Sequence, residues 1–219
     1  MKTAEIKYRV LTWVSSISIL IILLLPFHAF LTVWGASLIG HYTLLRLWKE
    51  FLLLAAGVGA LFLLITDHKM RSHTLTRRLV WAIALYAAVT VVWGLVSYLH
   101  HDVTLKAYGY GLIVNLRYLV FFLITWLLSL RLKRMRGTWQ WITLWPAAVV
   151  VLIGLLQIFI LPHNFLSHFG YSNATIPPFE TINHNKQYIR IMATLRGANP
   201  LGAYLLLPLS FLCVLLLHR

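Results

Sequence analysis

Long apolar runs alternate with short polar or basic connectors along the whole chain. A membrane-spanning helix needs about 20 apolar residues, and a stretch such as 31–47, which contains Trp34, Gly35 and Gly40, is too interrupted to span. We expect that stretch to be a connector at the membrane interface. The remaining runs predict an all-α polytopic membrane helix bundle, a single membrane domain over residues 1–219, with about six spans at 10–30, 48–65, 79–99, 111–130, 141–161 and 201–217.

The first apolar run has an alternative interpretation as a signal peptide, because basic residues precede a short apolar core. Residues 26–30 (PFHAF) offer no convincing small-residue cleavage site, and further spans follow. We therefore expect an uncleaved first span.

Composition excludes an ordinary soluble globule. Hydrophobic residues make up 60% of the chain and charged residues 11%, whereas soluble domains carry about 25% charge. The net charge of +14 would suggest nucleic acid in a soluble protein. Here most basic residues cluster between apolar runs, so we expect no nucleic-acid partner. The single cysteine, Cys213, lies in an apolar run and allows neither an intrachain disulfide nor a cysteine metal site.

The basic clusters predict the orientation of the spans, because cytoplasmic connectors are rich in Lys and Arg. With six spans, both termini lie on one side, and the charge pattern places them in the cytoplasm. The 162–200 loop is then extracytoplasmic. The residues predicted to be cytoplasmic are Lys2, Lys7, Arg9, Lys69, Arg71, Arg77, Arg78, Arg131, Lys133, Arg134, Arg136 and Arg219.

Other basic residues fall on the opposite side or in the fourth span, against the topology rule: Arg46, Lys49, Lys106, Arg117, Lys186, Arg190 and Arg196. Five of these, Arg46, Lys49, Arg117, Arg190 and Arg196, are candidates for one anion site. They can converge on one anionic ligand, although Arg46 and Lys49 can instead snorkel at the interface. Arg117 lies one to two turns inside the fourth span, where a guanidinium costs on the order of 3 kcal/mol. It therefore faces either a polar cavity or anion, or a structural partner.

The end of the 162–200 loop combines two arginines with a helix start. Arg190 and Arg196 precede Asn199, a plausible N-cap, and Pro200, which suits a first helical turn. Free N–H groups beside guanidinium groups form a good phosphate site. The alternative is an ordinary helix cap at the membrane surface.

The histidines of this loop carry a weaker signal. His163 and His168 are five residues apart and have no third ligand at useful spacing, so we expect no zinc site. His184 is either a base or substrate contact, or a plain polar loop residue.

The stretch 190–205 (RIMATLRGANPLGAYL), with LPFH at 25–28, LWKE at 47–50 and NLRY at 115–118, resembles the O-antigen ligase and polymerase family of bacterial membrane proteins. Members carry an Arg, then a Gly-Thr or similar pair, then Pro-Asn or Asn-Pro and a small-residue start to the next helix. In two respects this chain departs from the pattern: Ala193 stands where a Gly is common, and Arg196 is not an obvious family position.

The resemblance implies an inverting transfer at the outer face of the bacterial plasma membrane. A glycan leaves an undecaprenyl pyrophosphate carrier and joins an acceptor sugar, without metal, nucleotide sugar or other cofactor. Arg190 and Arg196 would then bind the pyrophosphate, with Arg117 and Lys49 as second choices, and the catalytic base is unassigned. Family members are about twice as long, with a His-bearing outer loop in their later half. We therefore expect this chain to be the N-terminal part of a longer protein.

Two other classes remain open. A transporter of an anionic or lipid-linked substrate would use the same arginines but usually has paired repeats, and the first three spans do not resemble the last three. A non-catalytic membrane assembly subunit would only contact headgroups or a partner through Arg190 and Arg196.

Overall fold

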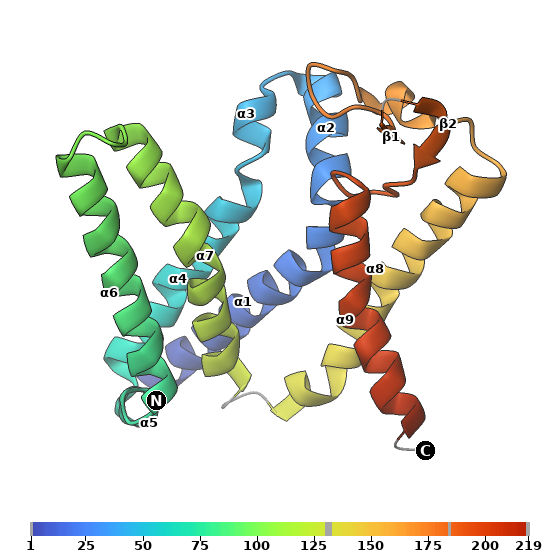
Figure 1. The fold of residues 1–219 in the computed structure, drawn as a ribbon. Helices are drawn as coiled ribbons and strands as arrows, with labels where there is room; N and C mark the ends of the chain where they lie inside the picture. Colours follow the sequence, from blue (N-terminus) through green and yellow to red (C-terminus); the bar gives the residue numbers. More distant parts are fainter. Residues whose placement is uncertain (1, 130–132, 184, 218–219) are drawn as a thin grey trace. The chain divides into compact units, whose positions relative to one another are not determined.

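The computed structural model describes residues 2–129, 133–183 and 185–217. Helices account for most of these residues, and the helices long and apolar enough to cross a bilayer agree with the expected number (Figure 1). The all-α polytopic fold is confirmed. Within the described ranges the candidate spans are Ala4–Ile39, Tyr42–Thr66, Arg78–Leu99, Leu105–Ser129, Gln140–Phe159 and Ala198–Leu217.

The elements follow one another with short connectors, except before the last helix. Their order is α1 (Lys2–Leu24), the 3₁₀ turn η1 (Leu25–Phe27), α2 (His28–Ile39), α3 (Tyr42–Leu45), α4 (Trp48–Thr66), α5 (His68–Leu75), α6 (Arg78–Leu99), α7 (Leu105–Ser129), α8 (Lys133–Phe159), the 3₁₀ turn η2 (Phe165–Phe169), β1 (Glu180–Ile182), β2 (Asn185–Arg190) and α9 (Ala198–Leu217).

The chain divides into two compact units. Unit 1 comprises Met1–Ser18 and Glu50–Lys133, and unit 2 comprises Ile19–Lys49 and Arg134–Arg219. Each unit therefore combines two separate stretches of sequence, and the boundaries fall inside helices α1, α4 and α8.

The first span extends further than the sequence predicts. Helix continues through α2 to Ile39 instead of ending near residue 30, and only α3 and short turns remain of the expected 31–47 connector. Trp34 and Gly35 do not interrupt a helix that contains no proline after Pro26, and the helix ends where Gly40 takes a φ of 79°. A straight helix of 36 residues would be longer than the roughly 30 Å hydrocarbon core. The helix is not straight, because the ribbon changes direction at η1 (Figure 1).

Unit 1 is held together by close helix contacts. Gly59 of α4 lies against α1 so tightly that an added Cβ would be 2.4 Å from a methyl of Val14. Gly94 of α6 lies against the ring of Tyr108 on α7, and the Tyr108 hydroxyl donates to the carbonyl of Val91 at 3.1 Å. Small residues that let helices approach are the usual basis of helix association in membranes.

Candidate functional site

The 162–200 segment is a folded layer rather than an open loop. Side chains from its first half pack on α2 of unit 2, and Leu166, Tyr171 and Met192 are almost fully buried with Val33. Gly170 makes this close approach possible. Its φ is +87°, and a Cβ there would lie 2.6 Å from Cβ of Ser37. Any side chain at position 170 would therefore face both strain and a clash.

The second half of the segment is tied to α8 by an amide clamp. Gln157 of α8 accepts a hydrogen bond from the Ala193 N–H at 2.9 Å and donates to the Ala193 carbonyl at 3.3 Å. Ala193 is fully buried and has a φ of 50°. Glycine adopts a left-handed backbone at little cost, whereas alanine there is strained. The two hydrogen bonds with Gln157 offset the strain of the alanine found at this position.

The next residue connects the segment to η1. Thr194 is buried, and its hydroxyl donates to the carbonyl of Pro26 at 3.0 Å. A carbonyl at a helix interruption has lost its regular partner, so this bond satisfies an acceptor that would otherwise be costly to bury.

The start of α9 is capped from a distant strand. The expected N-cap, Asn199, is wrong by two positions, because the helix begins at Ala198. The Ala198 N–H instead donates to the carboxylate of Glu180 on β1 at 3.1 Å, and Gly197 leaves room for that carboxylate. The helix terminus therefore already holds an anion from its own chain, which suits the positive end of the helix dipole.

Arg190 is anchored at the same place. β1 and β2 form an antiparallel hairpin in which Glu180 lies opposite Arg190 in the backbone register. The Arg190 guanidinium donates to the side-chain oxygen of Asn199 at 2.5 Å. This partner is neutral, so it orients the guanidinium without cancelling its charge. Arg196, in the turn before α9, is exposed, and no ion pair or hydrogen bond of its side chain is found among the described residues.

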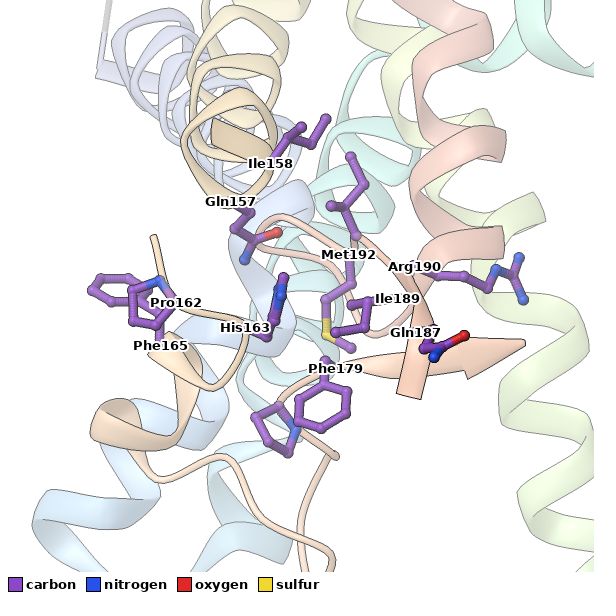
Figure 2. A pocket seen from close by; sticks show the side chains of 12 residues that line it. Gln157, Ile158, Pro162, His163, Phe165, Phe179, Gln187, Ile189, Arg190 and Met192 are labelled. Carbon is purple, nitrogen blue, oxygen red and sulfur yellow. The ribbon is translucent and has the colours of Figure 1, made fainter. Parts of the chain in front are cut away.

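A cavity of about 470 Å³ opens beside the hairpin within unit 2 (Figure 2). The stem of Arg190 lines it, and Figure 2 shows the guanidinium directed away from His163 and Gln157. The wall combines aromatic, aliphatic and uncharged polar side chains, a composition that suits a sugar ring as well as an apolar group. The lining residues are Gln157, Ile158, Pro162, His163, Phe165, Pro178, Phe179, Gln187, Ile189, Arg190, Ile191 and Met192.

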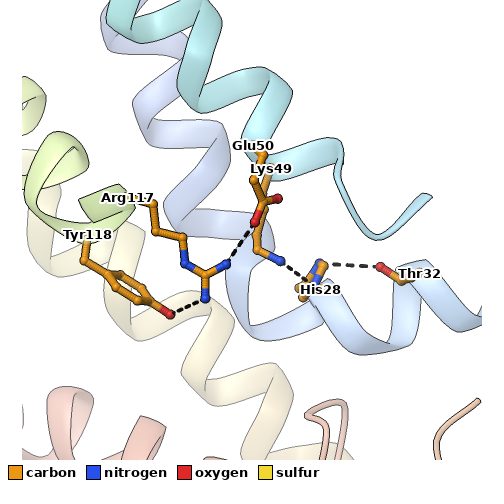
Figure 3. A network of polar contacts seen from close by, with 6 residues as sticks. All are labelled: His28, Thr32, Lys49, Glu50, Arg117 and Tyr118. Carbon is orange, nitrogen blue, oxygen red and sulfur yellow. Dashed lines mark hydrogen bonds and ion pairs between the residues drawn. The ribbon is translucent and has the colours of Figure 1, made fainter. Parts of the chain in front are cut away.

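Arg117 belongs to unit 1 and has an internal counter-ion. Its guanidinium donates to the carboxylate of Glu50 at 2.9 Å and to the hydroxyl of Tyr118 at 2.9 Å (Figure 3). The two charged side chains are only 24% and 19% exposed. Of the two interpretations left open by the sequence, the structure shows the structural partner.

Lys49, the chain neighbour of Glu50, belongs to unit 2 and also has a partner. Its ammonium donates to Nε2 of His28 at 2.7 Å, and Nδ1 of His28 lies 3.4 Å from the Thr32 hydroxyl (Figure 3). An ammonium has no acceptor capacity, so His28 must accept at Nε2 and carry its proton at Nδ1.

The four residues predicted to bind pyrophosphate therefore differ in their partners and in the unit to which they belong. Arg190 and Arg196 flank the start of α9 in unit 2, and Lys49 is also in unit 2, whereas Arg117 is in unit 1. His184 lies outside the described residues. Sequence reasoning missed the partners Glu50, Glu180 and Gln157. The signal for Glu50 was available, because a carboxylate in one span and an arginine in another predict an ion pair.

Comparison with known proteins adds no relative: no protein-family model matches the chain, and no curated protein or solved structure matches it. The class of protein is defined by the fold, and the chain is a multi-pass helical membrane protein.

Proposed function

We propose that this chain is part of a membrane glycosyltransferase of the bacterial plasma membrane. It would move a glycan from an undecaprenyl pyrophosphate carrier to an acceptor sugar at the outer face. The observation that carries the proposal is the folded 162–200 segment, in which Arg190 lines a cavity and neither Arg190 nor Arg196 forms an ion pair among the described residues.

The chemistry explains why such arginines are useful. An acceptor hydroxyl attacks the anomeric carbon and gives up its proton to a base. The bond from that carbon to the diphosphate oxygen breaks, and negative charge grows on the departing diphosphate. Guanidinium groups that bind this charge more strongly as it develops accelerate the reaction. Arg190 is oriented by Asn199 for this role, and Arg196 is exposed to reach the same anion. The cavity beside Arg190 would hold the adjoining sugar.

For Arg117 and Lys49, the contacts favour a structural role over pyrophosphate binding. The charge of Arg117 is neutralised by Glu50, and the ammonium of Lys49 is bound to His28. We therefore place the pyrophosphate on Arg190 and Arg196 and treat Arg117 and Lys49 as supports of their own units.

The test is glycan transfer from the lipid-linked donor by the complete protein in membranes. Removal of a donor that binds transition-state charge costs about 100- to 1000-fold in turnover, so we expect a loss of this size in Arg190→Ala and in Arg196→Ala. Arg190→Lys should recover only part of the activity, because lysine lacks the planar fork.

Arg46→Ala provides the matched control, since Arg46 is also an exposed arginine of unit 2 and lies outside the proposed site. It should leave turnover unchanged. Wild-type turnover in both Arg190→Ala and Arg196→Ala would remove the proposed site.

A further inference from the structure

A second cavity, in unit 1, differs in character from the one beside Arg190. It is a groove of about 450 Å³ formed by α4, α5, the start of α6 and α7. Figure 1 shows α5 at the end of α6 where that helix begins. Most of its wall is aliphatic, and the lining residues include Gly57, Ala60, Leu61, Arg71, Thr74 and Leu123.

The groove has an apolar surface that suits part of an acyl chain. From Gly57 to Ile65 it follows α4 for about 12 Å of helix axis, compared with roughly 15 Å for the hydrocarbon of one leaflet. Gly57 and Ala60 leave it open, and an added Cβ at Gly57 would meet no atom within 4 Å. Thr74, one of its two polar lining residues, donates its hydroxyl to the Met70 carbonyl at 2.7 Å, so it is internally satisfied.

Arg71 is the charged residue of the groove wall. It lies on α5, the short helix that follows α4, and its side chain is exposed. Among the described residues no hydrogen bond or ion pair of its side chain is found. The groove thus combines an apolar channel along a spanning helix with a cation at one end.

No carboxylate among the described residues forms an ion pair with Arg71. The chain has five acidic residues, and four of them have other partners: Glu5 pairs with Arg9, Glu50 pairs with Arg117, Asp67 caps α5, the helix that carries Arg71, and Glu180 caps α9. Asp102 follows the far end of α6, about 33 Å along that helix from its start. The exposed Arg71 guanidinium is therefore available to an anion from another molecule.

We propose that this groove binds an anionic phospholipid, with one acyl chain along α4 and α7 and the phosphate on Arg71. The charge pattern predicts that the α5 end is cytoplasmic, where anionic headgroups and juxtamembrane basic residues attract each other. Lys69, Arg77 and Arg78 are close to Arg71 in the sequence, but they do not line the groove. An apolar helix would fill the channel and leave Arg71 without a counter-ion, and a zwitterionic lipid would bring its phosphate together with a cation in its own headgroup.

The test uses the purified full chain in phosphatidylcholine nanodiscs that contain a small fraction of a lipid with a photoreactive acyl chain. This probe is phosphatidylglycerol in one arm and phosphatidylcholine in the other. Crosslinks at Leu61 and Leu123 in the groove are counted by mass spectrometry relative to those at Leu85, an exposed residue of α6 outside the groove. We expect about fivefold more groove labelling by phosphatidylglycerol, the factor that corresponds to ~1 kcal/mol per basic residue at an anionic surface.

Two pairs of variants separate the contribution of the lipid headgroup from that of the acyl chain. Arg71→Ala should bring the two lipids to equal groove labelling. Arg77→Ala, which removes a nearby exposed arginine bonded to His73 outside the groove, should not. Gly57→Leu should lower labelling by both lipids several-fold, whereas Gly109→Leu, at an equally open helix glycine outside the groove, should have no effect.

The proposal is overturned by equal groove labelling of the wild type by both lipids, or by a preference that survives Arg71→Ala. The proposal is also overturned if Arg77→Ala and Arg71→Ala reduce the preference for phosphatidylglycerol equally. The anionic lipid would then be attracted by the basic residues in general and not bound by Arg71. The Arg71→Ala arm decides the matter even if Gly57→Leu does not fold, and none of these measurements depends on glycan transfer.

Discussion

Arg117 and Arg190 are both arginines that the charge pattern places away from the cytoplasmic side, and the structure treats them differently. Arg117 is three-quarters buried in unit 1 and bonded to the carboxylate of Glu50. Arg190 is partly exposed in unit 2 and bonded to the neutral amide of Asn199. One guanidinium has its charge neutralised within the chain, whereas the other is only oriented.

The difference shows which arginine can bind a ligand. An anion that approached Arg117 would have to displace Glu50 and leave a carboxylate poorly solvated, which is costly. An anion at Arg190 displaces at most an amide oxygen. The 162–200 segment supports this second arrangement, because the Glu180 carboxylate on β1 accepts a hydrogen bond from the first residue of α9. The following predictions test the stability of these two environments.

The largest effect is expected from breaking the ion pair of unit 1. Glu50→Ala leaves the Arg117 guanidinium poorly solvated, and removal of one partner of a buried pair costs about 3 kcal/mol. Thermal unfolding in detergent should show a clearly lower Tm, and Glu50→Ala combined with Arg117→Ala should recover part of it. Glu5→Ala is the control, because its pair with Arg9 is exposed and contributes little. An unchanged Tm in Glu50→Ala would show that Arg117 does not depend on this carboxylate.

The next effect is a local loosening of the 162–200 segment in unit 2. Gly170→Val introduces a side chain at a φ of +87° and against Ser37, at a cost of about 2 kcal/mol. Amide hydrogen exchange of the segment should become about 30-fold faster. Gly202→Ala, at a helix position where a Cβ meets nothing within 4 Å, should leave exchange unchanged. Equal protection in the two variants would mean that the segment does not depend on its contact with α2.

A smaller effect is expected at the junction with η1. Thr194→Val keeps the shape of the side chain and leaves the Pro26 carbonyl without its donor, at a cost of about 1 kcal/mol. Exchange at residues 190–196 should rise several-fold. Thr12→Val removes a comparable hydroxyl bond in an exposed position of α1 and should change little. If both threonine variants behave alike, the bond to Pro26 does not stabilise the segment.

The smallest effect concerns Tyr171, whose buried hydroxyl has no hydrogen-bond partner among the described residues. Burial, with a smaller contribution from Tyr42, raises the pKa of Tyr171 well above its usual value of 10.0. The unfolded chain therefore loses this proton first, and the contribution to stability present below pH 10 is lost as the pH rises above it. Tyr171→Phe should have a Tm at pH 7 equal to or slightly above that of the wild type and a shallower decline above pH 10. The exposed Tyr188→Phe is the control at pH 7, and a steeper decline in Tyr171→Phe would contradict the expectation.

Much of the fold could be predicted from the sequence, and the errors are instructive. The later spans agree with the predicted runs to within several residues, because bilayer thickness sets their length. The sequence pattern predicts too short a first span, because Trp34 and Gly35 lie within α2 and neither breaks the helix. The N-cap of α9 was misplaced because the cap, Glu180, comes from a strand 18 residues earlier.

By itself the sequence determined the number of membrane-length helices and the positions of the basic clusters, because both depend on runs of neighbouring residues and on the solvent around them. Only the tertiary structure decided that Glu50 neutralises Arg117, that Gln157 and Thr194 hold the segment before α9, and that Arg190 bonds to an amide. These contacts join residues far apart in the chain. Their free energies depend on distance and burial in the folded state, which no local pattern of hydrophobic and polar residues records.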